Sequence, residues 1–243
     1  MRAMLLAAGL GTRLSPLTSD RPKCMVSVGG RAIIHRDIEW LRANGIEEIV
    51  INLYHHPQAV VDSIGNGSAF GVRVAYSREP QLLGTAGGVL AARPLIGEGT
   101  FVVAYADNLF DLRLASVIDD HRSSGATATM TLLSREDVSS SGVAVTSGDG
   151  WITDFQKKPL AGTEQSHWVN AGLLVCEPDL FDAIPAALPS DLSRDVMPNL
   201  ARRPHGLRGH RIGPGERVMW IDTLDDLRST EESLALDGRR GTR

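Results

Sequence analysis

Hydrophobic and polar positions follow two alternating patterns along the first half of the chain. Short apolar runs, typical of buried strands, alternate with stretches in which apolar residues recur every three or four positions, as on one face of a helix. In the first such stretch Ile34, Ile38 and Leu41 share a face, and Asn44 ends the helix. The alternation predicts a parallel sheet covered by helices on both faces. The predicted strands are 3–8, 48–53, 72–76 and 101–105, and the predicted helices are 33–44, 57–64 and 86–93.

The second half of the chain has more strand-like runs and fewer helices between them. We interpret these strands as the part of a mixed sheet that builds a second substrate site. The whole pattern predicts an α/β fold, a Rossmann-like three-layer αβα domain with a mixed, mainly parallel central sheet. The domain is expected to span 1–236, in halves of about 1–125 and 126–236, with a flexible tail at 237–243. The predicted elements here are strands 126–133, 142–145, 151–155, 168–176 and 217–221, and helices 178–184, 195–201 and 225–236.

Composition and charge argue against several classes of protein. The 243 residues are 42% hydrophobic and 22% charged, which is ordinary for a globular protein. The net charge of −4 argues against a general nucleic-acid binder, which usually has a basic face. No apolar stretch approaches the roughly 18 residues of a membrane helix, and the start lacks the pattern of a signal peptide. The two cysteines, Cys24 and Cys176, lie far apart in sequence, which favours a reduced, cytoplasmic setting.

The first apolar run leads into a glycine turn that is followed by two cations. Gly9 and Gly11 let backbone N–H groups approach an anion closely. Arg13 can fork onto two phosphate oxygens, and Lys23 supplies a compact second charge. A Rossmann dinucleotide turn would need a glycine in place of Leu14, and a Walker loop would need Gly-Lys-Ser/Thr. A plain β-turn would need neither cation, so the pattern favours a phosphate cradle.

The segment from Gly9 to Gly30 resembles the nucleotide-binding motif of the sugar-1-phosphate nucleotidyltransferases over its whole length. It reads GLGTRLSPLT, then RPK, then VGG. The resemblance implies a GT-A-like fold, in which 1–125 bind the nucleotide and 126–236 the sugar phosphate. It places Arg13 on the leaving pyrophosphate and Lys23 on the phosphate under attack. The residues that it implies for the nucleoside and the triphosphate are Leu6, Ala7, Ala8, Gly9, Gly11, Thr12, Arg13 and Lys23.

A second informative stretch, 79–88, reads EPQLLGTAGG at the start of a predicted helix. By itself it fits a loop that caps a helix with small residues. Beside the first motif it resembles the base-reading loop of the family, where Gln81 would bond a base edge and Gly84 and Thr85 would contact the nucleotide. The LGTAG wording resembles mannose-1-phosphate and heptose-1-phosphate guanylyltransferases, which implies GTP. UTP, CTP and dTTP stay open as alternatives.

Two acidic positions are candidates for a metal site. Asp107 follows an apolar strand, where open α/β sheets place catalytic groups. Magnesium prefers one or two carboxylates together with phosphate oxygens. The resemblance implies Mg²⁺ on Asp107 and on a second carboxylate, which we assign to Asp222, with Asp225 as the alternative. The family continues this last segment with Gly-Thr-Pro-Glu, whereas this chain has Thr-Leu-Asp-Asp.

The sugar-phosphate side carries a departure from the family pattern. The segment FQKKP resembles the family's Phe-x-Glu-Lys-Pro, so Lys158 matches the lysine that meets the sugar 1-phosphate. Lys157 stands where the family has a glutamate that holds a hydroxyl group, so hydroxyl recognition must differ. Without the resemblance, the two lysines would fit a solvated charge pair. Further sugar-side residues that the resemblance implies are Asn108, Gly142 and Asn170.

The resemblance implies transfer of a nucleoside monophosphate from a nucleoside triphosphate to a mannose- or heptose-like sugar 1-phosphate. Arg13, Lys23 and Asp107 would be the catalytic residues. The implied partners are these two substrates, without nucleic acid or membrane, and a homo-oligomer is allowed. The altered segment after Asp222 and the lysine at position 157 keep open a second class, a non-catalytic regulatory subunit that binds a nucleotide sugar.

Overall fold

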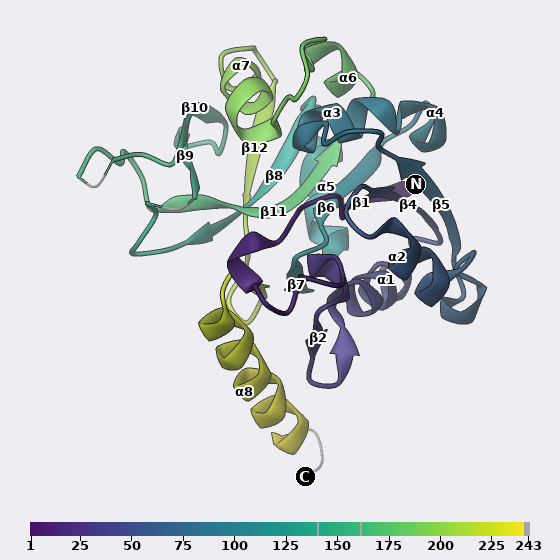
Figure 1. Ribbon diagram of the computed structural model, residues 1–243. Helices are drawn as coiled ribbons and strands as arrows, with labels where there is room; N and C mark the ends of the chain where they lie inside the picture. Colours follow the sequence, from purple (N-terminus) through teal and green to yellow (C-terminus); the bar gives the residue numbers. More distant parts are fainter. Residues whose placement is uncertain (140, 161, 241–243) are drawn as a thin grey trace.

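The computed structural model of the chain describes residues 1–139, 141–160 and 162–240 (Figure 1). The four strands predicted from the first half of the sequence are parallel and run side by side in the order β6-β1-β4-β5. Helices α2 and α3 begin a few residues after β4 and β5, whereas a long segment that contains η1, η2, β2 and β3 separates β1 from α1. These elements are β1 (Arg2–Leu6), α1 (Ile33–Ala43), β4 (Glu48–Leu53), α2 (Pro57–Ile64), β5 (Arg73–Arg78), α3 (Gly84–Ala91), α4 (Arg93–Ile96) and β6 (Phe101–Tyr105).

The second half extends the sheet with antiparallel pairs, which confirms a mixed sheet. Strand β11 lies antiparallel to β6 and joins it to the remaining strands. Beyond β6 on the same edge, β11 pairs through Val169 with β9, whereas β8 runs along its opposite edge and pairs in turn with the parallel strand β12. The added strands are β8 (Ala128–Ser134), β9 (Gly142–Thr146), β10 (Ile152–Lys157), β11 (Trp168–Cys176) and β12 (Leu207–Arg211).

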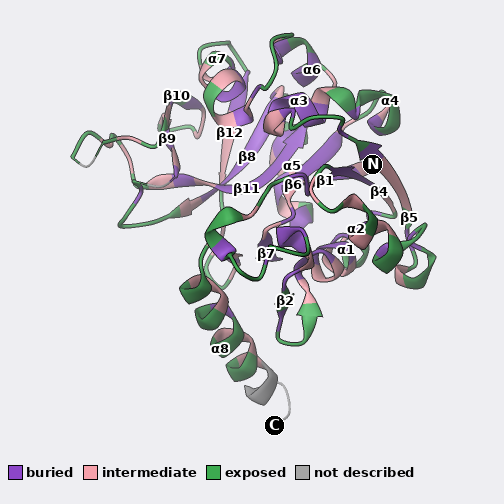
Figure 2. Cartoon of the chain, viewed as in Figure 1, coloured by how far each residue is buried: buried purple, intermediate pink, exposed green. Residues whose placement is uncertain are grey.

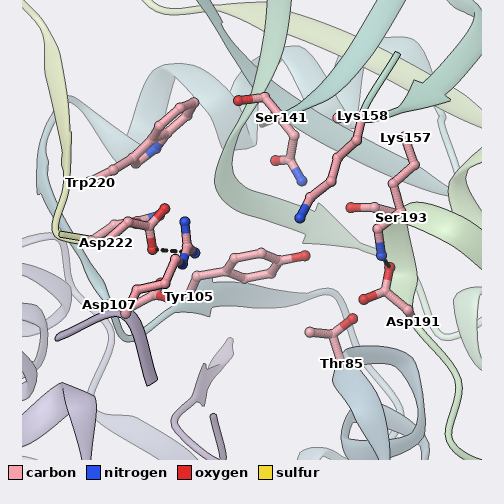
Figure 3. Close-up of a pocket in the computed structure, with 14 residues that line it drawn as sticks. Thr85, Tyr105, Asp107, Ser141, Lys157, Lys158, Asp191, Ser193, Trp220 and Asp222 are labelled. Carbon is pink, nitrogen blue, oxygen red and sulfur yellow. Dashed lines mark hydrogen bonds and ion pairs between the residues drawn. The ribbon is translucent and has the colours of Figure 1, made fainter. Parts of the chain in front are cut away.

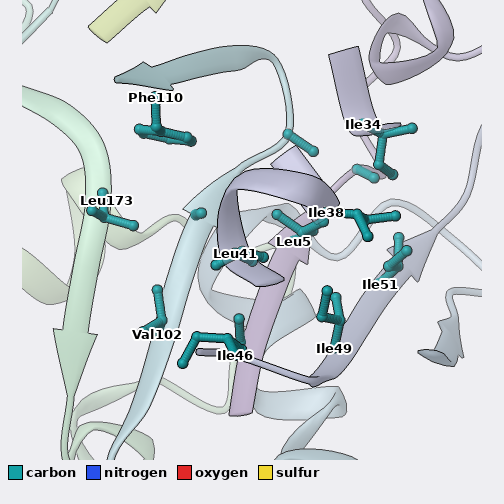
Figure 4. Close-up of a cluster of buried hydrophobic side chains, with 14 of the residues drawn as sticks. Leu5, Ile34, Ile38, Leu41, Ile46, Ile49, Ile51, Val102, Phe110 and Leu173 are labelled. Carbon is teal, nitrogen blue, oxygen red and sulfur yellow. The ribbon is translucent and has the colours of Figure 1, made fainter. Parts of the chain in front are cut away.

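Two hydrophobic cores cover the two faces of the sheet, because successive side chains of a strand point to opposite faces. Leu5 of β1 packs with Ile38 and Leu41 of α1 on one face (Figure 4). Met4 of the same strand packs on the other face with Val89 of α3. The strands between the helices are almost entirely buried, whereas the outer helix surfaces are exposed (Figure 2). This arrangement is the predicted three-layer αβα fold.

A two-stranded sheet lies beside the main one and positions part of the site. It pairs β7 (Asn108–Asp111) with β13 (Arg217–Trp220), and Trp220 lies opposite Asn108. Neither β7 nor β12 is predicted by the sequence patterns, and helix α5 (Leu114–Ser124) is missed as well. The last helix, α8 (Leu224–Arg240), is longer than predicted and includes residues that we had assigned to the tail (Figure 1). Residues 241–243 of that predicted tail lie outside the described residues.

The remaining elements are short. None of the helices in the described ranges has both the length and the apolar character needed to cross a bilayer. The predicted helix 195–201 is divided in the structure. Its first residues belong to the π-helical turn η4, and the rest form α7, which is only five residues long. These elements are η1 (Thr12–Leu14), η2 (Lys23–Met25), β2 (Ser27–Val28), β3 (Arg31–Ala32), η3 (Ser68–Phe70), α6 (Leu180–Ala183), η4 (Leu192–Val196) and α7 (Met197–Ala201).

Candidate active site

The glycine turn begins where β1 ends and passes over Lys23. Gly11 has a φ of +64°, and a Cβ atom there would lie 2.8 Å from the Cβ of Lys23. Thr18 Oγ1 donates to the carbonyl of Gly11 at 2.9 Å, which closes the turn. A Cβ atom on Gly9 would meet no protein atom within 4 Å. Gly11 is therefore required by the close approach of the backbone to Lys23, whereas the space over Gly9 is open to a ligand.

A cluster of four charges, Arg13, Lys23, Asp107 and Asp222, lies beside this turn, and Figure 3 labels its two carboxylates. Lys23 Nζ donates to Asp107 Oδ2 at 2.8 Å and to Asp222 Oδ1 at 2.6 Å. The guanidinium of Arg13 lies 2.9 Å from the same Asp222 oxygen. Burial works to raise the pKa of Asp222, but Lys23 and then Arg13 outweigh it and hold this pKa below its usual value. Lys23 is only 8% exposed, so its charge is fixed between the two carboxylates.

The pairing of β7 with β13 brings the two carboxylates together, although 115 positions separate them in sequence. The N–H of Ile221 donates to the carbonyl of Asp107 at 3.2 Å, one residue beyond the last pair of the β7–β13 ladder. Asp226 accepts from the backbone N–H of Asp222 and so holds this corner. The alternative second carboxylate, Asp225, has a side chain that is 91% exposed and pairs with Arg228. The geometry thus favours Asp222 over Asp225.

These two carboxylates fit a magnesium ion. Asp107 Oδ1 is buried and has no hydrogen-bond partner among the described residues, as expected of an oxygen that binds an ion. Among the described residues, no group of three or more His, Cys, Asp or Glu side chains is placed to hold a metal ion without ligands from a substrate. Because Mg²⁺ usually completes its shell with substrate phosphates and water, two carboxylates are sufficient. Asp107 and Asp222 are the residues that would hold it.

A buried polar network ties the glycine turn to the predicted base-reading loop. The N–H of Ala7 donates to Asn52 Oδ1 at 2.7 Å, and Asn52 Nδ2 donates to Glu79 Oε1 at 2.7 Å. Glu79 Oε2 accepts from the N–H of Leu83 at 2.9 Å. Burial raises the pKa of Glu79, although these two donors favour its ionised form. We missed Asn52 from the sequence, although a polar residue within an apolar strand is a signal that could have revealed it.

The predicted nucleotide-binding residues of the base-reading loop do not all lie in the same place. Gln81 is exposed to solvent. Gly84 has a φ of +79°, and a Cβ atom there would collide with the carbonyl of Ser190. Thr85 Oγ1 accepts from the N–H of Leu192 at 2.8 Å and lines the same cleft as the sugar-side residues. Of these three residues, therefore, only Thr85 is among those that line the cleft.

The cleft itself has a volume of about 300 Å³, at the lower limit for small-molecule sites. Arg13, Lys23 and Asp222 line a second hollow at one end, beside the glycine turn. The chain has three lysines, and all of them line these two hollows. Predicted residues that line the cleft are Arg13, Thr85, Asp107, Asn108, Gly142, Lys158, Asn170 and Asp222. Residues that sequence analysis did not assign to the site are Tyr105, Asp191, Ser193 and Trp220.

The sugar side of the cleft is assembled from β9, β10 and β11. Lys158 has a φ of +51°, and its N–H donates to the carbonyl of Ser141 at 2.9 Å, which bends the chain at the end of β10. Gly142 is small because a Cβ atom would lie 2.5 Å from the ring of Phe155. Asn170 Oδ1 accepts from the N–H of Gly172 at 2.9 Å, which leaves its Nδ2 to donate. Lys158, Gly142 and Asn170 thus each have a local structural reason for their position.

A family model described as nucleotidyl transferase matches residues 2–223 of this chain. The chain belongs to the nucleotidyl transferase family. The match includes both ends of the cleft, from the glycine turn to Asp222.

Curated relatives agree with this assignment. A UTP–glucose-1-phosphate uridylyltransferase of Synechocystis is 36% identical over 213 residues, which are 82% of this chain and 55% of the relative. The catalytic subunit beta of a mannose-1-phosphate guanylyltransferase of Dictyostelium discoideum is 32% identical over 204 residues, 83% of this chain and 56% of the relative. This nucleotidyl transferase chain therefore spans about half the length of the curated relatives it matches.

A solved structure shares the fold of this chain over nearly its whole length. It is a putative glucose-1-phosphate thymidylyltransferase from Bacillus anthracis, superimposed with a TM-score of 0.84 at 22% identity. The match covers 96% of this chain and 94% of the other. The likeness agrees with the three-layer arrangement and the mixed sheet described above.

Proposed function

We propose that this chain transfers a nucleoside monophosphate from a nucleoside triphosphate to a sugar 1-phosphate, with release of pyrophosphate. The observation that carries the proposal is the position of the three lysines. Lys23 lies between two carboxylates beside the glycine turn, and Lys157 and Lys158 lie across the same cleft. A cleft with cations at both ends suits two phosphorylated substrates that must meet between them.

The mechanism follows from charge. An oxygen of the sugar phosphate attacks the α-phosphorus, a new P–O bond forms, and the bond to the β-phosphate oxygen breaks. Both reactants are polyanions, so Lys158 at one end and Arg13 with Lys23 at the other offset their repulsion. Holding the two in line makes the step nearly unimolecular. The attacking oxygen is already an anion, so the site needs no general base.

Asp107 and Asp222 would hold Mg²⁺, for the reasons given above. When bound, the ion neutralises phosphate charge and polarises the reacting phosphoryl group. The residues of the chain keep their own tasks. Lys23, held within 2.8 Å of both carboxylates, would contact the attacked phosphate, and Arg13 would contact the departing pyrophosphate, as the family motif implies.

We propose GTP as the preferred triphosphate, with UTP, CTP and dTTP as alternatives. Two observations support GTP: the LGTAG sequence of the base-reading loop, and the relatives named as mannose-1-phosphate guanylyltransferases. The relative named as a uridylyltransferase keeps UTP in view. For the sugar, a mannose- or heptose-like 1-phosphate remains the proposal.

A catalytic role is favoured over a regulatory one by the charged cluster. A subunit that only bound a nucleotide sugar would not need a buried lysine between two carboxylates, because burying charged groups costs free energy. Ion pairs join Arg13, Lys23, Asp107 and Asp222 in one cluster.

The test is a panel of reactions. Mg²⁺-dependent pyrophosphate release would be measured with ATP, GTP, UTP, CTP and dTTP, each against mannose, glucose, galactose and heptose 1-phosphates. We expect turnover with at least one pair and the highest kcat/KM with GTP. Turnover with UTP alone would discard the preference for guanine. No turnover with any pair would support the regulatory subunit instead.

A further inference from the structure

Lys157 makes an ion pair within the sugar side of the cleft. Its Nζ donates to Asp191 Oδ1 at 2.7 Å. The two side chains are 32% and 25% exposed, so the pair is only partly open to solvent. Lys157 comes from the end of β10, whereas Asp191 comes from the loop before η4, and only the fold brings them together.

Asp191 is held rigidly in this position. Its Oδ1 also accepts from the N–H of Arg194 at 2.9 Å, and its own N–H donates to Asp195 Oδ2 at 2.7 Å. The next residue, Leu192, donates its N–H to Thr85. The other carboxylate oxygen of Asp191 points into the cleft (Figure 3). A carboxylate fixed in this way presents one oxygen to a ligand without having to reorganise.

Two hydroxyl-bearing side chains lie beside the pair. Tyr105 and Ser193 line the cleft next to Asp191, and the tyrosine hydroxyl points toward Lys158 (Figure 3). Burial, and then the negative charge of Asp191, raises the pKa of Tyr105, so it stays a neutral hydroxyl. This wall of the cleft therefore offers an ammonium donor, a carboxylate acceptor and two neutral hydroxyls within one small area.

We propose that Lys157 and Asp191 act as one unit that binds adjacent hydroxyl groups of a neutral hexose, and that they determine the sugar specificity. This inference rests on the proposed function. A sugar hydroxyl both donates and accepts, so it can donate to the Asp191 carboxylate and accept from the Lys157 ammonium. The acceptor that the family motif supplies from position 157 is supplied here from position 191.

The charge of the pair excludes another class of sugar. Asp191 neutralises Lys157, so Lys158 is left as the cation that receives the 1-phosphate. A carboxylate or second phosphate on the sugar would find no free ammonium in this pair, so the cost of removing its charge from water would not be offset. Uronic acid 1-phosphates and sugar bisphosphates should therefore be poor substrates.

The test compares hexose 1-phosphates with their monodeoxy analogues in the complete chain. For wild type we expect the deoxy analogue at one or two adjacent positions to lose roughly 100-fold in kcat/KM, because sites built to bond a hydroxyl reject its absence strongly. In Asp191→Asn and in Lys157→Met that discrimination should fall to a few-fold. The KM for the nucleoside triphosphate should stay within about twofold, since the pair lies away from the glycine turn.

Arg194→Gln is the matched control. Its exposed side chain pairs with Asp195, and only its backbone contacts Asp191. This variant should keep the wild-type discrimination, and the melting temperature of each variant reports whether the η4 loop is intact. Discrimination unchanged in both Asp191→Asn and Lys157→Met, or a wild-type preference for glucuronic acid 1-phosphate over glucose 1-phosphate, would overturn the inference. Absence of turnover with every pair would instead overturn the proposed function together with it.

Discussion

The two ends of the cleft are built in different ways. The end beside the glycine turn takes Gly9, Gly11, Arg13 and Lys23 from one continuous stretch of sequence, to which the β7–β13 pair adds Asp107 and Asp222. The sugar end is assembled from β6, β9, β10, β11, β13 and η4. A short motif can define a site that holds a phosphate chain, whereas a site for a varied sugar is built from many segments that can change separately.

Both ends nevertheless hold their cations in the same manner. Lys23 is fixed by Asp107 and Asp222, and Lys157 is fixed by Asp191. In each case a carboxylate orients an ammonium group before any substrate arrives. The difference is burial, because the side chain of Lys23 is 10% exposed and that of Lys157 is 32% exposed. A buried charge interacts more strongly, so changes at the triphosphate end should have the larger effects.

The largest expected effect follows from Lys23→Met. Removal of the charge at the attacked phosphate should lower kcat by about 1,000-fold, since a single group that stabilises developing charge contributes this much. The measurement is pyrophosphate release under saturating substrates, with circular dichroism to confirm folding. Arg21→Gln is the control, because Arg21 is exposed and pairs only with Asp20 in the described contacts. A folded Lys23→Met variant that keeps more than a tenth of kcat would contradict the mechanism.

The second prediction separates the two candidate metal ligands. Asp222→Asn should lower kcat by about 100-fold and raise the Mg²⁺ concentration needed for half-maximal rate, because the removed charge faces Lys23. Asp225→Asn should change neither by more than about twofold, since that side chain is 91% exposed. Rates measured over a Mg²⁺ titration decide this point. Equal effects of the two substitutions would reject Asp222 as the second ligand.

A third prediction concerns the sugar end alone. Lys158→Met should raise the KM for the sugar 1-phosphate roughly 10- to 100-fold, the range for loss of a hydrogen bond to a charged group. The KM for the nucleoside triphosphate should hardly change. Initial rates with each substrate varied in turn give both constants. If both KM values rose equally, the two ends could not be treated as separate sites.

A fourth prediction contrasts two glycines of the same turn. Gly11→Ala should destabilise the fold by roughly 1–3 kcal/mol, because the residue has a φ of +64° and its Cβ would press on Lys23. Gly9→Ala should leave the free energy of unfolding within about 0.5 kcal/mol. It should nevertheless weaken binding of the nucleotide about tenfold, since the new methyl group occupies the ligand's space. Urea denaturation and nucleotide titration test the pair, and tight binding by Gly9→Ala would place the nucleotide elsewhere.

The smallest effect is expected from the core beneath the triphosphate end. Asp37 of α1 is 1% exposed, and neither carboxylate oxygen has a hydrogen-bond partner among the described residues. Burial, and then the charge of Asp107, raises the pKa of Asp37 well above its usual value. The folded state therefore binds this proton more strongly than the unfolded chain does. Stability should fall as pH rises from about 4, the unfolded value, toward the raised pKa.

Asp37→Leu removes this dependence and keeps the number and branching of the side-chain heavy atoms. We expect it to increase the free energy of unfolding by about 1–2 kcal/mol at neutral pH, because a buried polar group without partners is replaced by an apolar one. Urea denaturation at about pH 5 and about pH 8 should show the larger gain at the higher pH. A gain that did not depend on pH would show that Asp37 does not titrate across this range.

Much of the fold could be predicted from local patterns of apolar and polar residues in the sequence. The strands of β1, β4, β5 and β6 and the helices between them follow from apolar periodicity, and the mixed sheet follows from the change of pattern in the second half. Helix α5 and strands β7 and β12 were missed. The pattern of β12, Leu207–Arg211, is mostly polar, and β7 is only four residues long, so neither carries a strong periodic signal.

The sequence by itself determined the family and identified the glycine turn with its two cations, because those residues are neighbours along the chain and their spacing defines the motif. The tertiary structure decided which carboxylate joins Asp107, since the β7–β13 ladder brings Asp222 to Lys23 and leaves Asp225 exposed. It also decided that Lys157 pairs with Asp191. Contacts between residues far apart in sequence depend on how strands pair and pack, and no local spacing encodes that.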